Sequence, residues 1–338
     1  MQIETGTSLK PYNSFGLPAV AQRLVRITSD SDVRRMVDHP DLGRSPHFIL
    51  GGGSNIVLTR DLPATVLKVE VMGKRLVSED ASAWIVEAGA GENWHELVMW
   101  TLAQGWPGLE NLALIPGTVG AAPVQNIGAY GLELRDRFES LDAVDLCTGR
   151  SVTLGPSVCA FAYRDSVFKH DLAGRSLITR VRFRLPKPWA PVLGYLELER
   201  KVAETGITQP GAQLIADWVI AIRRAKLPDP QVIGNAGSFF KNPVVTPEQC
   251  RDIIGRDPAV VHYPMPDGNV KLAAGWLIDA CGWKGKSVGG ASVYEKQALV
   301  LVNRGGATGS EVLTLARAIQ ESVYGRFGIR LEPEPVVV

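Results

Sequence analysis

The chain has 338 residues, of which 45% are hydrophobic and 21% are charged, so its composition excludes a disordered protein and allows a sizeable core. Its 36 basic and 35 acidic residues give a net charge of +1. This balance excludes a strong overall attraction to nucleic acid or to an anionic membrane, and an anionic ligand would need a local pocket.

The four cysteines (Cys147, Cys159, Cys250 and Cys281) are widely spaced and form no Cys-x-x-Cys pair, and the five histidines show no metal-binding spacing. This argues against a zinc site, a redox dithiol and a disulfide scaffold, and it favours reduced thiols. The first ten residues lack a signal pattern, and no apolar run approaches the ~20 residues that span a bilayer. We therefore expect a soluble, cytoplasmic protein with no metal and no membrane or nucleic-acid partner.

The predicted elements begin with a short α/β unit between residues 20 and 70. Its strands are expected at 25–27, 48–50 and 65–71, and its helix at 29–37, where Ser and Asp residues provide the cap. A strand at 84–88 and a helix at 93–104 follow, because apolar residues recur at helical spacing in the second segment.

The next stretch, 105–131, is poor in charge, rich in Gly, Pro, Ala and Asn, and without clear periodicity. Loops of this length inside compact domains are usually functional. Beyond it the sequence predicts strands at 140–144 and 176–185, a break at 186–191 and a helix at 210–224. The last third is predicted to contain segments at 247–254 and 273–279, a strand at 298–302 and a helix at 310–327.

One glycine cluster, Gly51-Gly52-Gly53-Ser54-Asn55, follows a predicted strand but is not a dinucleotide fingerprint, because Ile56 stands where the third glycine would be needed. A P-loop at Gly285-Lys286-Ser287 fails because Ala280 replaces the leading glycine. What remains is a turn whose N–H groups can converge on phosphate oxygens. A purely structural turn stays an open alternative.

The second cluster covers residues 116–131 and reads P-G-T-V-G-A-A-P-V-Q-N-I-G-A-Y-G. Its small residues expose backbone amides to a large flat ligand, while Gln125 and Asn126 can hydrogen-bond heteroatoms. A long connector is the alternative, but connectors rarely avoid charge over such a length.

Five motifs together carry a resemblance to a known family. G-G-G-S-N, G-L-E-N-L-A-L-I-P-G-T-V-G, Q-N-I-G-A-Y-G, Y-R-D-S-V-F-K and G-N-A-G-S-F-F-K-N-P occur in this order. From about residue 9 to 334 the chain resembles the UDP-N-acetylenolpyruvoylglucosamine reductases, and Tyr195 in P-V-L-x-Y is similar to their first, longer type. The resemblance implies an α+β fold of the vanillyl-alcohol-oxidase or PCMH type that binds FAD, with a separate C-terminal α+β substrate-binding domain.

The resemblance also implies an organisation and an activity. We expect an FAD-binding domain at 15–190 with a subdomain split near 70, a substrate-binding domain at 205–325, and a tail at 326–338 that carries the catalytic glutamate. The implied reaction is the NADPH-dependent reduction, through FAD, of the enolpyruvyl group of UDP-N-acetylenolpyruvoylglucosamine to UDP-N-acetylmuramate in peptidoglycan precursor synthesis. The family is usually monomeric.

The glycine clusters would supply the FAD site. The FAD is expected to be non-covalent, because Ser54 follows the glycine triplet where related flavin oxidases often carry a flavin-attaching histidine. Ala121-Ala122 departs from the serines that relatives can carry, so a hydroxyl contact to FAD is lost there. The expected FAD-binding residues are Gly52, Gly53, Ser54, Asn55, Pro116, Gly117, Val119, Gly120, Ala121, Gln125, Asn126, Gly128, Ala129 and Gly131.

The implied chemistry needs donors at a carboxylate and an acid at the neighbouring carbon, because hydride addition to the enol ether gathers charge on an enediolate. Arg164 suits the carboxylate, although an ordinary salt bridge is the alternative. Ser238 suits the donation of a proton to the neighbouring carbon. A capping role in a helix or turn is the alternative. Glu334 would hold the carboxylate region, with Glu332 as the rival if the register slips by two.

Six further residues are expected to bind the substrate. Lys226 offers a charge to the UDP pyrophosphate, although it would also complement the end of a helix. The departure at Leu196, where a glycine might be expected, puts the mobility of its loop in doubt. The full set is Tyr130, Tyr163, Tyr195, Lys226, Asn242 and Gln297.

Two other functions compete with this one. A flavin oxidase of sugars or alcohols would keep the fold, and a nucleotide-sugar binding module would have lost the flavin. The combination of Arg164, Ser238 and Glu334 counts against the oxidase, and a yellow purified protein would remove the binding module. No arginine can be assigned to a 2′-phosphate, so the choice between NADPH and NADH stays open.

Overall fold

A computed structural model describes all 338 residues, which divide into two compact units. Unit 1 comprises 1–7, 21–53 and 62–225, and unit 2 comprises 8–20, 54–61 and 226–338. This division differs from the expected ranges, because short early segments belong to unit 2 and most of the helix before Lys226 belongs to unit 1. The expected tail at 326–338 is part of unit 2. None of the helices has the length and apolar character needed to cross a membrane.

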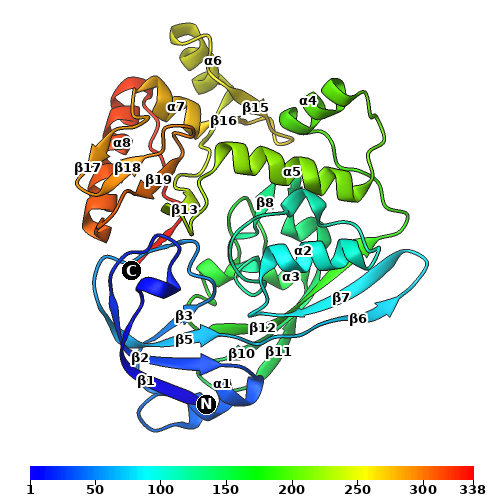
Figure 1. Ribbon diagram of the computed structural model, residues 1–338, viewed down its shortest axis with the longest axis vertical. Helices are drawn as coiled ribbons and strands as arrows, with labels where there is room; N and C mark the ends of the chain where they lie inside the picture. The colour runs from blue at the N-terminus through cyan, green and yellow to red at the C-terminus, as the bar shows by residue number, and fades with distance from the viewer. The chain divides into compact units, whose positions relative to one another are not determined.

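Unit 1 begins with a four-stranded sheet in the order β1-β2-β5-β3 (Figure 1). Its strands are β1 (Gln2–Ser8), β2 (Val20–Ile27), β3 (His47–Leu50) and β5 (Leu62–Val69), and β5 pairs in parallel with both β2 and β3. Helix α1 (Asp30–Asp38) begins after Ser29, whose side chain accepts from Asp32 N, and it buries Val33 and Met36. Strand β3 ends at the glycine triplet.

The second sheet of unit 1 is antiparallel, in the order β11-β10-β12-β7-β6. Helix α2 (Trp94–Ala103) packs against it, since the Trp94 and Phe183 rings meet edge to face at 5.6 Å. Leu97 and Val98 of α2 share the same buried cluster with Phe183 and Val181 of the sheet. The strands are β6 (Lys74–Glu79), β7 (Ala83–Gly89), β10 (Phe138–Asp145), β11 (Ser151–Leu154) and β12 (Ser176–Pro186).

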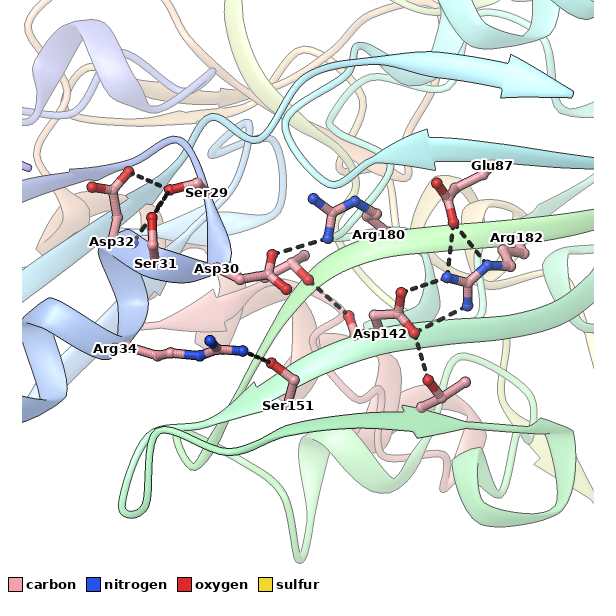
Figure 2. A network of polar contacts seen from close by, with 12 residues as sticks. Ser29, Asp30, Ser31, Asp32, Arg34, Glu87, Asp142, Ser151, Arg180 and Arg182 are labelled. Atoms are coloured by element: carbon pink, nitrogen blue, oxygen red, sulfur yellow. Dashed lines mark hydrogen bonds and ion pairs between the residues drawn. The ribbon is translucent and has the colours of Figure 1, made fainter. Parts of the chain in front are cut away.

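Charged side chains of this sheet pair with one another and with a side chain of α1 (Figure 2). Arg182 donates to Glu87 at 2.8 Å and to the two oxygens of Asp142 at 3.0 and 2.5 Å. Arg180 lies 3.0 Å from Asp30 at the start of α1. Burial alone would raise the pKa of Asp142, but hydrogen bonds from Arg182 and from a threonine outweigh it and lower that pKa. These charged side chains pair within the protein, and we assign them to the stability of the sheet.

The remaining helices of unit 1 precede the segment that belongs to unit 2. Helix α4 (Leu196–Thr205) ends at Gly206 in the left-handed conformation, and α5 (Ala212–Lys226) buries Ile215, Trp218 and Val219. The short α3 (Pro156–Cys159) buries Cys159, and burial raises the pKa of that thiol to about 11. Cys159 is therefore a protonated core residue.

Unit 2 has an antiparallel sheet in the order β13-β19-β18-β17 and a three-stranded sheet in the order β14-β16-β15. The long helix α8 (Gly309–Phe327) contacts β17 and β18 (Figure 1) and begins with a capping box between Thr308 and Glu311. The other elements are α6 (Pro247–Arg256), α7 (Ala274–Ala280), β13 (Gly234–Ser238), β14 (Val244–Val245), β15 (His262–Pro264), β16 (Val270–Leu272), β17 (Ser287–Val288), β18 (Ala291–Val293) and β19 (Val300–Asn303).

A short parallel pair connects distant parts of the sequence within unit 2. Strand β20 (Val336–Val337) pairs with β4 (Ile56–Val57). Thr59 donates from both its N–H and its hydroxyl to the carbonyl of Val338, at 2.7 and 2.8 Å. The segment after the glycine triplet is thus fixed by the tail that contains Glu334.

Candidate active site

The glycine triplet of unit 1 follows β3 and meets the second glycine-rich loop. A Cβ on Gly52 would lie 2.9 Å from the Cα of Gly117, closer than real Cβ contacts. Lys68, opposite Leu50 in the sheet, donates its ammonium to the Gly51 carbonyl at 2.7 Å. Glycine at these positions therefore allows two protein loops to approach each other, in addition to leaving room for a ligand.

The second loop is fixed against the end of β7 by backbone bonds. Val119 N donates to Glu92 O and Gly120 N to Ala90 O, both at 2.9 Å. A Cβ on Gly120 would lie 2.4 Å from the Cβ of Ala90, so only glycine fits there. Gly117 adopts a φ of 117°, in the region that favours glycine. The loop is thus rigidly placed by its neighbours.

Thr118 lies in the middle of this loop, and its hydroxyl has no partner in the protein. The oxygen is buried, and a Cβ on Gly51 would lie only 2.7 Å from it. The N–H groups of Gly117 and Thr118 also take no part in the backbone bonds of the loop. A buried polar group without a partner costs about 1–3 kcal/mol, so this loop fits a ligand that supplies polar atoms. Neither Gly51 nor Thr118 was among the predicted residues, although Thr118 is the one hydroxyl of P-G-T-V-G.

Asn126 was expected to hydrogen-bond the cofactor with its side chain. In the structure that side chain is fully buried and bonded to protein groups. Its Nδ2 donates to Glu133 Oε2 and to Ala162 O, both at 2.9 Å, and its Oδ1 accepts from Arg135 N at 3.0 Å. Any contact between Asn126 and a cofactor therefore falls to its backbone.

The other predicted cofactor residues of unit 1 lie along the same two loops. Ala121 lies beside Gly51, where a Cβ on the glycine would be 3.2 Å from that of the alanine. Gln125 ends a 3-10 helix, Gly128 and Ala129 form the short strand β8, and Gly131 has a φ of 84°. Ser54 and Asn55 belong to unit 2.

Arg164 occupies the tip of a tight turn in unit 1. Ala162 and Asp165 close this turn with two backbone bonds, of 3.0 and 3.2 Å. Arg164 has a φ of 55°, a conformation that costs a non-glycine residue on the order of 1 kcal/mol and that clusters at functional sites. Its Nη2 donates to Gly128 O at 2.7 Å, and its guanidinium carbon lies 5.4 Å from the centre of the Tyr163 ring.

Two predicted substrate residues meet in unit 1. The rings of Tyr130 and Tyr195 pack edge to face at 5.3 Å, and the Tyr130 carbonyl accepts from the buried side chain of Asn111 at 2.8 Å. Burial raises the pKa of Tyr130, and it lowers the pKa of the neighbouring Arg223, whose Nε is buried without a partner. Sequence reasoning missed Asn111 and Arg223, and Asn111 is part of the quoted G-L-E-N-L motif.

Ser238 and Glu334 are brought together in unit 2. Ser238 ends β13 directly after Gly237, which has a φ of 69°. Phe239 follows, and its carbonyl accepts from Glu334 N at 2.8 Å. Asn55 Nδ2 lies 3.3 Å from the Glu334 carbonyl. The residue directly after the serine is therefore the one that pairs with the glutamate.

The rival Glu332 has a different environment. Its side chain is 74% exposed and pairs with Lys241 at 3.1 Å, whereas Glu334 is only partly exposed. Phe239 and Phe240, the two residues that follow Ser238, are both buried, and their ring centres lie 5.2 Å apart. Of the two glutamates, Glu334 is the one whose backbone pairs with the residue directly after the serine.

Asn242 and Gln297 lie at the same end of α7. Asn242 Oδ1 accepts from Ala274 N at 3.0 Å, at the first residue of the helix. A Cβ on Gly275 would lie 3.0 Å from Gln297 Oε1. Lys226 is the last residue of α5 and belongs to unit 2.

The histidines have structural partners, and no group of three or more His, Cys, Asp or Glu side chains could hold a metal ion. His95 Nδ1 accepts from Leu114 N at 3.0 Å, so the hydrogen bond requires an unprotonated Nδ1. Burial lowers the pKa of His95, which favours the neutral form. His170 lies 2.8 Å from Asp165, next to Arg164.

The chain is similar to known proteins over its whole length. A family model described as UDP-N-acetylenolpyruvoylglucosamine reductase, C-terminal domain, matches residues 229–338, and one described as FAD binding domain matches residues 21–155. A UDP-N-acetylenolpyruvoylglucosamine reductase of Azoarcus sp. (strain BH72) is 59% identical over 342 residues, covering 100% of this chain and 98% of the relative. One of Burkholderia vietnamiensis (strain G4 / LMG 22486) is 58% identical, covering 97% and 95%.

A solved structure also matches over the full length. The crystal structure of UDP-N-acetylenolpyruvylglucosamine reductase from Thermus caldophilus has a TM-score of 0.68 and 25% identity, covering 100% of this chain and 99% of that chain. These matches confirm the predicted α+β FAD-binding fold followed by a separate C-terminal domain.

Proposed function

The chain belongs to the UDP-N-acetylenolpyruvoylglucosamine reductase family, and we propose that Arg164, Ser238 and Glu334 carry out its reaction. The identity of 59% over the whole chain carries the assignment of the activity. The chain is an oxidoreductase that reduces the enolpyruvyl group of UDP-N-acetylenolpyruvoylglucosamine, in peptidoglycan precursor synthesis, with FAD and NADPH.

Bound FAD supplies a hydride carrier between NADPH and the substrate. Residues that would hold it in unit 1 are the glycines of the two loops, the amides of Gly117 and Thr118, and the unpartnered Thr118 hydroxyl. Backbone amides and a hydroxyl are the donors that phosphate and flavin heteroatoms need. We propose the remaining predicted residues, from Gly52 to Asn55 and from Pro116 to Gly131, as contacts of the same cofactor.

Arg164 is proposed to bind the carboxylate of the enolpyruvyl group. Its Nη2 donates to Gly128 O at 2.7 Å, and the planar fork of a guanidinium matches the two oxygens of a carboxylate. Because hydride addition transfers charge to this carboxylate, a permanently charged donor stabilises the product of that step more than its reactant. The bond to Gly128 O orients the guanidinium.

Ser238 is proposed to donate the proton that completes the reduction, and Glu334 to assist at the carboxylate region. A serine hydroxyl is a weak acid, so a neighbouring group must stabilise the charge that develops. The bond between Glu334 N and Phe239 O keeps the glutamate backbone beside the serine. This arrangement supports Glu334 over Glu332 for that task.

Tyr130, Tyr163, Tyr195, Lys226, Asn242 and Gln297 are proposed to bind the UDP-sugar. We further propose that the protein acts as a cytoplasmic monomer and prefers NADPH to NADH. Light scattering of the purified protein tests the first statement, and the ratio of kcat/KM for the two nucleotides tests the second.

Ser238→Ala is the experiment that tests the mechanism. Reduction of the flavin by NADPH, followed in a stopped-flow instrument, should keep its rate. Reoxidation by the enolpyruvyl substrate should slow by roughly three orders of magnitude, the scale of a lost general acid. Equal loss in both half-reactions would show that Ser238 is not the proton donor.

A further inference from the structure

We propose that Asn126 is a positioning residue for Arg164, joining the cofactor loop at 116–131 to the turn that carries the arginine. The proposal rests on the role of Arg164 given above and adds the device that orients it. The hydrogen bonds of the Asn126 side chain go to protein groups, so any contact between Asn126 and the cofactor is left to its backbone.

The first support is the state of the Asn126 side chain. It is fully buried, and its amide makes three hydrogen bonds, two as donor and one as acceptor, at 2.9, 2.9 and 3.0 Å. Its φ of 44° is left-handed, which asparagine tolerates better than most residues do. A side chain with this many buried bonds holds a fixed orientation and resists displacement.

The second support is the acceptor that Asn126 selects. The carbonyl of Ala162 also accepts from Asp165 N, and so it is one of the two groups that close the turn around Arg164. Two residues beyond Asn126, the carbonyl of Gly128 accepts from the arginine Nη2 at 2.7 Å. The cofactor loop thus holds both the backbone of the turn and the guanidinium at its tip.

A third contact joins the same two segments. The Ser166 hydroxyl donates to the carbonyl of Val124 at 2.6 Å. Gly128 leaves space for the arginine, because a Cβ there would lie 3.1 Å from Nη1 of Arg164. Residues 124–128 and 162–166 therefore form one clamp, with Asn126 at its buried centre.

The chemistry of the clamp explains why an amide is needed at 126. Nδ2 donates to a carboxylate and to a carbonyl, while Oδ1 accepts from the backbone N–H of Arg135. An aspartate would set a second carboxylate against Glu133 and against the Ala162 carbonyl. A leucine would leave the Arg135 N–H without its partner and would remove one donor each from Glu133 and from the Ala162 carbonyl. Only asparagine combines these donors and this acceptor in so short a side chain.

Asn126→Gly tests the proposal in the holoenzyme, because glycine accepts the left-handed φ and removes only the side chain. We expect flavin reduction by NADPH to stay within about threefold of the parent. Reoxidation by the enolpyruvyl substrate should slow by about 10- to 100-fold, the scale of a reacting group misplaced by an ångström. Asn126→Asp should slow the same half-reaction at least as much.

A buried asparagine elsewhere provides the matched control. Asn13 makes a similar set of buried bonds, to Leu9 O at 2.8 Å, to Leu17 O at 3.0 Å and from Leu17 N at 2.9 Å. Asn13→Gly should lower the melting temperature without changing the ratio of the two half-reaction rates. The same ratio in Asn13→Gly and Asn126→Gly would reduce Asn126 to a structural role.

A double-mutant cycle separates this proposal from the role of Arg164. Arg164→Lys alone should slow reoxidation, and if it does not, the role of the arginine is wrong. Adding Asn126→Gly to Arg164→Lys should cause no further slowing if Asn126 acts through the arginine. Full additivity overturns the proposal while leaving Arg164 in place. If Asn126→Gly gives no folded holoenzyme, Ser166→Ala opens the same clamp and takes its place in the cycle.

Discussion

Replacing Gly120 by alanine tests whether the glycines of the cofactor loop serve protein packing. The added Cβ would lie 2.4 Å from Ala90 Cβ, whereas carbon atoms pack at about 3.5–4.0 Å. The loop must therefore move by about 1 Å. A displacement of this size breaks the 2.9 Å bonds from Gly120 N and Val119 N, which contribute about 1 kcal/mol each.

The expected loss is thus about 2–3 kcal/mol of the free energy that holds the loop in place. If FAD binds only to the loop in its original position, the FAD affinity falls by roughly 30- to 150-fold. Quenching of flavin fluorescence on titration of apoprotein measures this affinity, and thermal unfolding measures stability. Gly211→Ala is the matched control, because nothing lies within 4 Å of its Cβ and its φ is not positive. Gly120→Ala with parental affinity and stability would refute the packing argument.

Two further predictions concern single charges. Glu334→Gln should slow substrate reduction by at least ~10²-fold, whereas Glu332→Gln should stay within about twofold in the same stopped-flow assay, because Glu334 pairs with the residue directly after Ser238 and the exposed Glu332 pairs with Lys241; the reverse order would restore the rival register. Arg182→Met should destabilise the fold by about 1–3 kcal/mol in urea unfolding, because it removes the shared partner of Asp142 and Glu87 and leaves the buried Glu87 paired with Arg75 alone. Because the pKa of Asp142 is lowered in the folded protein, its contribution to stability is present above the ordinary aspartate pKa and is lost as pH falls. The variant should therefore lose less stability than the parent on acidification below about pH 4. An unchanged dependence of stability on pH would contradict this.

Local signals predicted the helices well. The helix expected at 29–37 is α1 (Asp30–Asp38), and the one expected at 310–327 is α8 (Gly309–Phe327). Both begin at a Ser or Thr cap whose side chain accepts a backbone N–H, and that signal lies within four residues of sequence. The strand expected at 176–185 is β12 (Ser176–Pro186), where buried residues dominate.

Elements without such signals were missed. Strands β6 and β11 are the edges of their sheet and are mostly exposed, so apolar alternation does not mark them. Helix α4 (Leu196–Thr205) buries only Leu198 and was not predicted. The pairing of β4 with β20 depends on residues 280 positions apart (Ile56 and Val336), which no local pattern encodes.

At the candidate site, the motifs identified residues but not their partners. Arg164, Ser238 and Glu334 came from the resemblance, and their roles stay proposals. No local pattern predicts that Asn126 bonds to Ala162 or that Gly120 faces Ala90, because both contacts join loops brought together by folding. Thr118 was not predicted, because the glycines near it in Gly117-Thr118-Val119-Gly120 indicated contacts through the backbone and not through a side-chain hydroxyl.

The parallel strand pair of unit 2 has a consequence for biosynthesis. The segment at 54–61 leaves the ribosome early, yet its partner strand, Val336–Val337, is synthesised nearly 280 residues later. Until then Thr59 has no Val338 carbonyl to bond, and the backbone that carries Glu334 does not exist. Unit 2 can therefore mature only after residues 336–338 have been synthesised, whereas most of unit 1 is made earlier and can begin to fold on the nascent chain.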